Sequence, residues 1–252
     1  MDEGEWILIS QIDHAHLAGK LAEHWGAADI VLPVPHAELW AIHHHDDGWR
    51  EWEQTPDIEP RAGRPRQFTE MPVEDSLAIW TASIEIACQA DNLAGFVVAG
   101  HFCALARRSP AWRNGTAQGA KVARFITHFE DQAAIWQQAW HGENPATNTV
   151  EIARRALARL QFFDSLSLWF CCAPASEPER IESPDGPPLT LASVDPRRVQ
   201  LSPWPLAVPN LNLEIPARAV AVRRYRDSAD LARAPSRKVQ LDWQLVAGEP
   251  NP

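Results

Sequence analysis

Side chains that bind metal ions well occur at four separated places in this chain. His14 stands alone, residues 43–47 read His-His-His-Asp-Asp, and His101 and Asp164 follow much later. Imidazole nitrogen combined with carboxylate oxygen suits Fe, Mn, Zn or Ni better than Ca²⁺ or Cu(I). If the fold brings these places together, they predict a shared centre for one or two divalent transition-metal ions.

The apolar residues around these side chains indicate that they face inward on helices. At about 100° per residue, His14 lies on an apolar stripe, and Asp164 lies on the centre line of a stripe that includes Leu160 and Leu168. His101 lies on the shoulder of a third stripe. A buried carboxylate is costly without a compensating cation, although an arginine or a helix N-terminus could serve Asp164 instead of a metal. Either histidine alone is better explained as a core residue, but together the four places favour a metal site.

A long connection rich in arginine, tryptophan and proline follows the histidine run. It extends from Arg50 to Pro72, and long connections in compact domains are often functional lids. Its arginines favour either a solvated loop or an anion-binding site. Its aromatic residues could line the mouth of a pocket. The residues concerned are Arg50, Arg61, Arg64, Arg66, Trp49 and Trp52.

The elements that must position these residues are mostly helices. Ser10 is a good N-cap for a helix reaching Trp25, and further helices are predicted at about 36–47, 74–90, 92–107, 117–141 and 149–172. Alternating apolar residues predict strands at 211–215 and 239–245, with shorter ones at 189–191 and 220–222. The sequence thus predicts a mainly α protein, a helical bundle with a small C-terminal antiparallel β appendage.

Composition changes near residue 173, which suggests two parts. All ten histidines lie between His14 and His141, whereas 13 of the 21 prolines fall in the last 80 residues. We therefore predict a helical metal-binding domain over residues 1–172. A proline-rich β region over residues 173–252 packs on it, or forms an arm that grips a partner subunit. The sequence leaves the oligomeric state open, with a homo-oligomer among the alternatives.

Charge and apolar content bound the class of protein. With 23 Lys+Arg against 33 Asp+Glu, the net charge is −10, and no basic stripe suggests nucleic-acid binding. No apolar run is long enough to cross a bilayer, and the start of the chain is acidic, unlike a secretory signal. The four cysteines form no C-x-x-C pair. These features predict a cytoplasmic protein with reduced thiols.

The order of the candidate ligands resembles the HD superfamily of metal-dependent phosphohydrolases. His14, then His45-Asp46, then the distant Asp164 follow that pattern. Several short runs are more closely similar to one bacterial family catalogued only as a domain of unknown function, over roughly residues 6–172. These runs are Gln11-Ile12-Asp13-His14-Ala15, His45-Asp46-Asp47-Gly48-Trp49, Gly100-His101-Phe102 and Phe163-Asp164-Ser165-Leu166-Ser167-Leu168.

The resemblance implies ligands, chemistry and a substrate class. It selects His45 from the three consecutive histidines because this residue precedes Asp46. It implies an HD-like helical fold and an enzyme that hydrolyses a phosphoester with one or two bound ions. His101, with or without His128, would line the position of a second ion. Asp46 would take part in catalysis, and Asp47 would orient a ligand or act as a base. Arg50, Arg64, Arg66 and Trp49 would then bind a small, phosphorylated substrate.

Two other functions fit the same residues. Some HD proteins with extra histidines are di-iron oxygenases, which would need two irons per chain and would consume oxygen. A non-catalytic binding protein stabilised by a metal would show a large metal-dependent gain in thermal stability without turnover. The identity and number of bound ions would separate these hypotheses.

Overall fold

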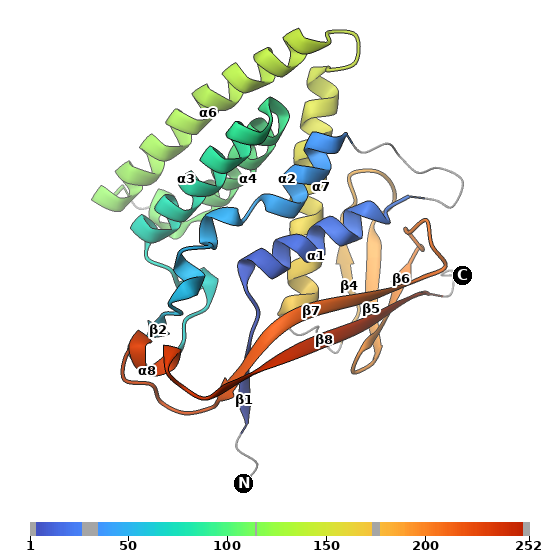
Figure 1. The fold of residues 1–252 in the computed structure, drawn as a ribbon. Helices are drawn as coiled ribbons and strands as arrows, with labels where there is room; N and C mark the ends of the chain where they lie inside the picture. Colours follow the sequence, from blue (N-terminus) through green and yellow to red (C-terminus); the bar gives the residue numbers. More distant parts are fainter. Residues whose placement is uncertain (1–3, 27–34, 114, 173–176, 249–252) are drawn as a thin grey trace.

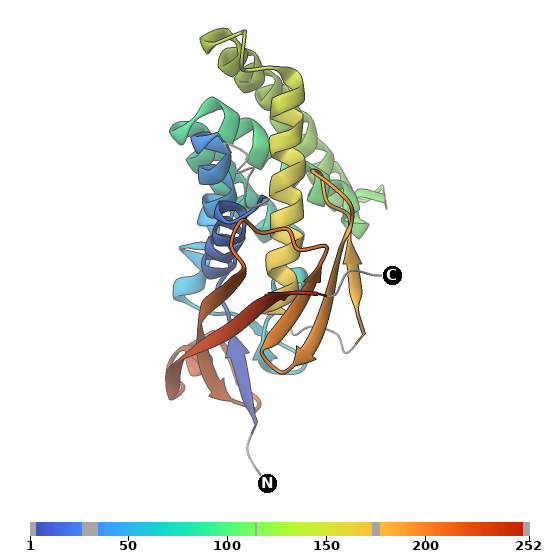
Figure 2. The same ribbon diagram turned by 90° about the vertical axis from the view of Figure 1, so that its right-hand side faces the viewer.

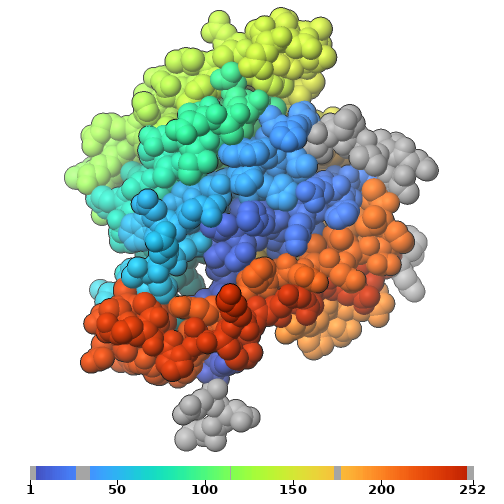
Figure 3. All heavy atoms as spheres, viewed as in Figure 1, coloured from blue at the N-terminus to red at the C-terminus, as the bar shows by residue number. Residues whose placement is uncertain are grey.

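The computed structural model describes residues 4–26, 35–113, 115–172 and 177–248 and shows a layer of helices on a curved β-sheet (Figures 1 and 2). In Figure 3 the C-terminal strands form a continuous band below the helices. The acidic start that bears on localisation lies partly outside the described residues. The longer helices are α1 (Gln11–Glu23), α2 (His36–His44), α3 (Val73–Ala90), α4 (Asn92–Arg108), α6 (Ala117–Glu143) and α7 (Val150–Cys171).

The sheet has six strands in the order β1-β7-β8-β6-β5-β4. Their bounds are β1 (Glu5–Leu8), β4 (Glu179–Ile181), β5 (Leu189–Asp195), β6 (Arg198–Ser202), β7 (Asn210–Ala221) and β8 (Ser236–Ala247). Neighbouring strands are antiparallel except β6 and β8, which run parallel, with Val199 opposite Leu245. The long β7–β8 pair passes beneath α1. Two further short helices are α5 (Pro110–Arg113) and α8 (Ser228–Ala232).

The predicted fold class, a helical bundle with a small antiparallel appendage, is therefore wrong. The sheet is larger, it is mixed, and its edge strand β1 comes from the opposite end of the chain, with Trp6 opposite Val220. Apolar alternation indicates that a segment is a strand, but it does not indicate which strand pairs with which. Four residues of β1 are also too few to show a period of two. The division at residue 172 stays a prediction, although β1 lies before it and pairs after it.

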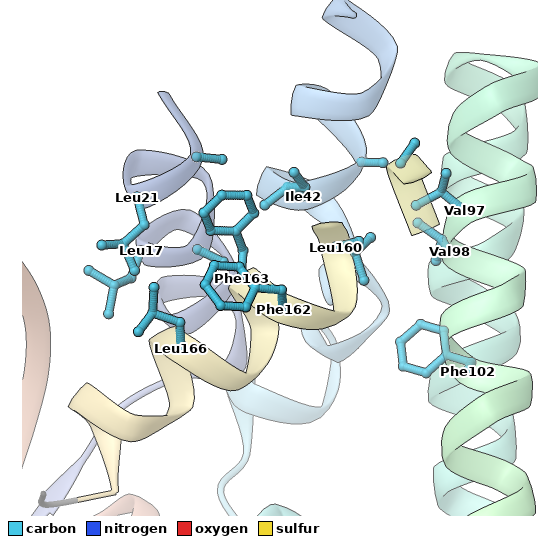
Figure 4. Close-up of a cluster of buried hydrophobic side chains, with 14 of the residues drawn as sticks. Leu17, Leu21, Ile42, Val97, Val98, Phe102, Leu160, Phe162, Phe163 and Leu166 are labelled. Atoms are coloured by element: carbon cyan, nitrogen blue, oxygen red, sulfur yellow. The ribbon is translucent and has the colours of Figure 1, made fainter. Parts of the chain in front are cut away.

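The helical layer shares its core with the sheet. Side chains from α1, α2 and α7 interlock, among them Leu17, Ile42, Leu160 and Phe163, which are at most 1% exposed (Figure 4). The same cluster extends to strand residues such as Leu213. Full burial of one such side chain contributes roughly 1.5–3 kcal/mol. This packing fixes α1, α2 and α7 relative to one another, and these helices carry or adjoin most of the candidate ligands.

Side-chain caps fix the starts of α1, α4, α6 and α7. Ser10 accepts a hydrogen bond from the backbone N–H of Asp13 at 2.9 Å, and its hydroxyl donates to the Asp13 carboxylate at 2.6 Å. The predicted N-cap is thus confirmed. Asp91 and Thr149 cap α4 and α7 in the same way. Such caps typically contribute about 1 kcal/mol, and the first of them holds His14 in the opening turn of α1.

The arginine-rich connection packs against the far end of the sheet. It contains the short helices η1 (Asp47–Trp49), η2 (Trp52–Gln54) and η3 (Phe68–Glu70), and the strands β2 (Ile58–Glu59) and β3 (Arg64–Pro65). The carbonyl of Gly63 accepts from the N–H of Tyr225 at 2.7 Å, and the Ser228 hydroxyl donates to Asp57 at 2.8 Å. Figure 1 shows β2 beside α8. The connection is therefore tied to the β7–β8 end of the molecule.

A buried ion-pair network joins the helices to the segment after β4. Arg159 of α7 donates from Nε to Asp185 at 2.6 Å and from a terminal nitrogen to Glu38 of α2 at 3.3 Å. All three side chains are at most 7% exposed. Burial raises the pKa of Glu38, although Arg159 opposes this effect.

No described helix is long and apolar enough to span a membrane.

Candidate metal centre

Five predicted ligand side chains meet in the interior. His14 comes from the first turn of α1, His45 and Asp46 follow the end of α2, His101 lies on α4, and Asp164 lies on α7. Two overlapping groups, His14/His45/Asp46 and His45/His101/Asp164, each place their ligand atoms within 4.8 Å of one another. The three histidines are at most 3% exposed. These buried groups could hold a metal ion.

The distances around the centre match the spacing of ligands on one ion. His14 Nε2 lies 3.0 Å from Asp164 Oδ1 and 3.8 Å from Asp46 Oδ2. His45 Nε2 lies 3.4 Å and 3.6 Å from the same two oxygens. Ligands about 2.1 Å from an ion lie about 3.0 Å apart at right angles and about 3.4 Å apart at the tetrahedral angle. These four distances are compatible with ligands around one ion, and His45 is the residue that the two groups share.

A backbone contact fixes the orientation of His45. Its Nδ1 lies 2.9 Å from the carbonyl oxygen of Ile42, which can only accept, so Nδ1 carries the proton. In the neutral ring Nε2 then presents a lone pair to the centre. This buried nitrogen has no hydrogen-bond partner within the described part of the chain. An unpaired buried acceptor of this kind fits a metal ligand.

Ser167 fixes His14 in the same way. The Ser167 hydroxyl donates to the carbonyl oxygen of Asp164 at 2.9 Å, so its single proton is used there. It must therefore accept from His14 Nδ1, which lies 2.9 Å away. The neutral His14 ring then also directs its Nε2 lone pair at the carboxylate of Asp164. Two lone pairs and two carboxylates that face one another favour a cation between them, which is either a metal ion or a proton carried by an imidazole.

The electrostatics of the centre favour positive charge at His45. Burial alone would lower the pKa of His45, but Asp46 and Asp164 outweigh it and raise the pKa to about 9. Burial raises the pKa of Asp46, whereas the surrounding histidines hold the pKa of Asp164 well below its usual value. Burial lowers the pKa of His101 to about 4, and its Nδ1 is unpaired among the described residues. His101 is therefore neutral and available as a ligand.

A tight turn places Asp46 beneath α3. The N–H of Gly48 donates to the Ser83 hydroxyl at 3.0 Å, and a Cβ atom at this glycine would lie only 2.2 Å from the carbonyl oxygen of Ile79. The N–H of Trp49 returns to the carbonyl of Asp46 at 3.0 Å. This close approach requires glycine at position 48 and explains the local sequence after His45.

Several predicted site residues lie outside this cluster. The two oxygens of Asp47 contact His44 at 3.0 Å and Arg50 at 3.2 Å. Arg64 pairs with Glu70 at 2.5 Å and Arg66 with Asp57 at 2.6 Å. Trp49 is 9% exposed and hydrogen-bonds Asp46. His128 is exposed, and its ring centre lies 4.8 Å from that of Phe129. Their proposed roles in catalysis, substrate binding or a second ion stay predictions.

Two residues near the centre were not anticipated from the sequence. Ser167 is three residues from Asp164, so helical spacing alone places it on the same face. Glu53 accepts from the N–H of Gln11 at the start of α1. Burial raises the pKa of Glu53 to about 7, and the charge of Asp46 adds to this effect. No local pattern reveals Glu53, because its position depends on how the connection folds back onto α1.

Ser167→Ala is expected to weaken metal binding without unfolding the protein. The change removes the acceptor that holds His14 in its metal-binding orientation, and such orienting contacts typically change metal affinity 10- to 100-fold. Competition with a chromogenic chelator measures this affinity. Ser193→Ala is the matched control because Ser193 lies in β5 and bonds only to Asp195 among the described residues. Equal affinity in both variants would remove Ser167 from the centre.

The fold and the site together define a class of protein. Its helices pack on a mixed sheet, and histidines and aspartates in its interior could hold a metal ion. Comparison with protein families assigns residues 1–222 to DUF3891, described as a protein of unknown function. Because the match covers most of the chain, the protein belongs to this family. Neither the curated proteins nor the solved structures contain a match to the chain.

Proposed function

We propose that this protein is a metal-dependent hydrolase of phosphoesters, with one divalent transition-metal ion held by His14, His45, Asp46 and Asp164. The proposal is carried by the four acceptor atoms that face one another at 3.0–3.8 Å. Ser167 and the Ile42 carbonyl orient both rings so that each Nε2, when it carries no proton, directs a lone pair at the carboxylates. The residues therefore fit a metal ion of the Fe, Mn, Zn or Ni type.

The shared histidine favours one ion over two. His45 belongs to both candidate groups, but its Nδ1 bonds to the backbone, so only Nε2 remains. A neutral imidazole nitrogen has one lone pair and binds one ion. His14, Asp46 and Asp164 would therefore hold the ion that His45 binds, with His101 beside them. A di-iron oxygenase needs a second full set of ligands, which these contacts do not favour.

The chain's own residues would bind and orient the reactants. A bound divalent ion would polarise a phosphoryl oxygen and activate water as a nucleophile. In the net reaction water adds to phosphorus, the ester P–O bond breaks, and the alcohol leaves with a proton. His101 lines the same centre, and its Nδ1, which has no partner among the described residues, could accept a hydrogen bond from a bound reactant. Glu53 lies in η2, accepts a hydrogen bond from the N–H of Gln11 and can exchange a proton near neutral pH.

The sequence order supports the same proposal. His14, His45-Asp46 and Asp164 resemble the HD superfamily in their order, and all of them lie on or beside helices as that superfamily implies. The mixed sheet departs from the helical bundle that the resemblance implies. The hydrolytic chemistry therefore rests on the ligand set and its order rather than on the whole fold.

Reconstitution with single metals tests the proposal. Protein stripped with chelator would be reloaded with Mn²⁺, Fe²⁺, Zn²⁺ or Ni²⁺ and assayed with phosphomonoesters and phosphodiesters. We expect turnover that appears with metal and is absent in Asp164→Asn. Oxygen consumption with two irons per chain would instead show an oxygenase. A metal-dependent rise in melting temperature without any turnover would show a non-catalytic protein.

A further inference from the structure

A cavity of about 410 Å³ opens beside the metal centre. It lies between α4, α7 and the segment that follows β4, and its walls include His101 and Asp164 from the centre. A volume of this order accommodates a small molecule. A second cavity, of about 480 Å³, lies among Arg180, Thr190 and Trp204 and contains none of the candidate ligands.

An exposed arginine that has no partner among the described residues lines the cavity. Arg108, near the end of α4, has no ion pair and no side-chain hydrogen bond to any residue that the structure describes. Its neighbour Arg107, in contrast, is paired with Glu130. Arg108 follows His101 by two helical turns, about 10 Å along the axis. Arg108 and His101 both line this cavity.

The sheet side of the cavity is held in place. Ser183 and Glu182 line it, and Asp185 immediately beyond them is bound by Arg155 at 2.5 Å and by Arg159 at 2.6 Å. Glu182 is 81% exposed and lies 3.5 Å from Arg180, so its charge is directed to solvent. The wall is therefore preformed, and its acid does not neutralise the cavity's arginine.

We propose that this cavity binds a small anionic substrate and that Arg108 binds its anionic group. The inference rests on the proposed hydrolase function for the identity of that anion as a phosphate. A guanidinium binds phosphate through two parallel hydrogen bonds. The arginines predicted from the sequence are instead engaged by acids: Arg50 by Asp47, Arg64 by Glu70 and Arg66 by Asp57. The side-chain amide of Gln161 and the hydroxyl of Ser183 add neutral donors to the same walls.

Arg108→Gln tests the site, with Arg107→Gln as the matched neighbour. Calorimetric titration with inorganic phosphate and with pyrophosphate would be done on metal-loaded and chelator-stripped protein. We expect Arg108→Gln to weaken anion binding at least about 10-fold in both forms, the effect of losing one charged bidentate contact. Metal content and melting temperature should stay unchanged. In a phosphoester assay, KM should rise much more than kcat falls.

The outcomes separate this inference from the proposed function. Anion binding that depends on Arg108, without phosphoester turnover, would support the cavity and contradict the hydrolase. Turnover with metal but equal anion binding in wild type and Arg108→Gln would contradict the cavity alone. Equal weakening by Arg107→Gln, or no binding of either anion to wild type, would also overturn the assignment.

Discussion

Asp164→Asn is expected to abolish stable metal binding while leaving the protein folded. The amide keeps the size of the carboxylate but removes the negative charge that faces His14 at 3.0 Å and His45 at 3.4 Å. Altering a group that only orients a ligand costs 10- to 100-fold in affinity, so losing a ligand should cost at least about 100-fold. Elemental analysis after gel filtration should find less than about a tenth of the wild-type metal.

Asp131→Asn provides the control for this change. Asp131 is an exposed aspartate of α6, and its loss alters net charge by the same amount. It should retain full metal content and any turnover. Full metal occupancy in Asp164→Asn would show that the carboxylate pairs with protonated histidines rather than with a metal ion.

Among the substitutions proposed for this protein, Arg159→Met is expected to lower the free energy of unfolding most. The change leaves Glu38 and Asp185 buried, with side chains 2% and 4% exposed. Breaking one partner of a buried ion pair typically costs 3–5 kcal/mol. In a domain of this size that corresponds to a fall in melting temperature of roughly 10 °C. Thermal unfolding followed by circular dichroism measures it.

Arg155→Met is the matched control for that prediction. Arg155 binds the same Asp185, but its side chain is 51% exposed, and exposed pairs contribute about 0–1 kcal/mol. Adding Glu38→Gln to Arg159→Met should recover part of the stability, because it removes one uncompensated charge. An equal loss in Arg159→Met and Arg155→Met would contradict the structural role of the buried network.

The candidate centre could be predicted well where helical periodicity was informative. His14 and Asp164 interrupt apolar stripes, so their inward positions follow from spacing alone, and the structure places them 3.0 Å apart. Spacing alone does not single out His45, because three consecutive histidines point in different directions. The resemblance selects His45, and this residue is fully buried. Ser167 could have been found from its spacing to Asp164. Arg108 could not, because nothing local shows that an arginine lacks a partner.

The fold was harder to predict because pairing is a property of distant segments. The predicted helices lie close to their observed bounds, because most of them have either a side-chain cap, as α1, α4 and α7 do, or a proline at the N-cap position, as α2 and α3 do. Strands β5, β7 and β8 were expected from alternation, but β1 and β4 are short. The parallel pairing of β6 with β8 has no local signal. The sequence predicts that Arg50, Arg64 and Arg66 bind the substrate, and this stays a prediction; their acidic partners, such as Glu70, could not be predicted because they depend on how the connection folds.

Anomalous diffraction from crystals of the metal-loaded protein tests the central claim most directly. For a centre that holds one ion, we expect one anomalous peak within about 2.0–2.3 Å of His14 Nε2, His45 Nε2 and the facing oxygens of Asp46 and Asp164. A centre without a peak, with all four side chains placed as described here, would contradict the account. A pair of peaks about 3.5–4 Å apart would contradict the single-ion centre and favour the two-metal chemistry instead.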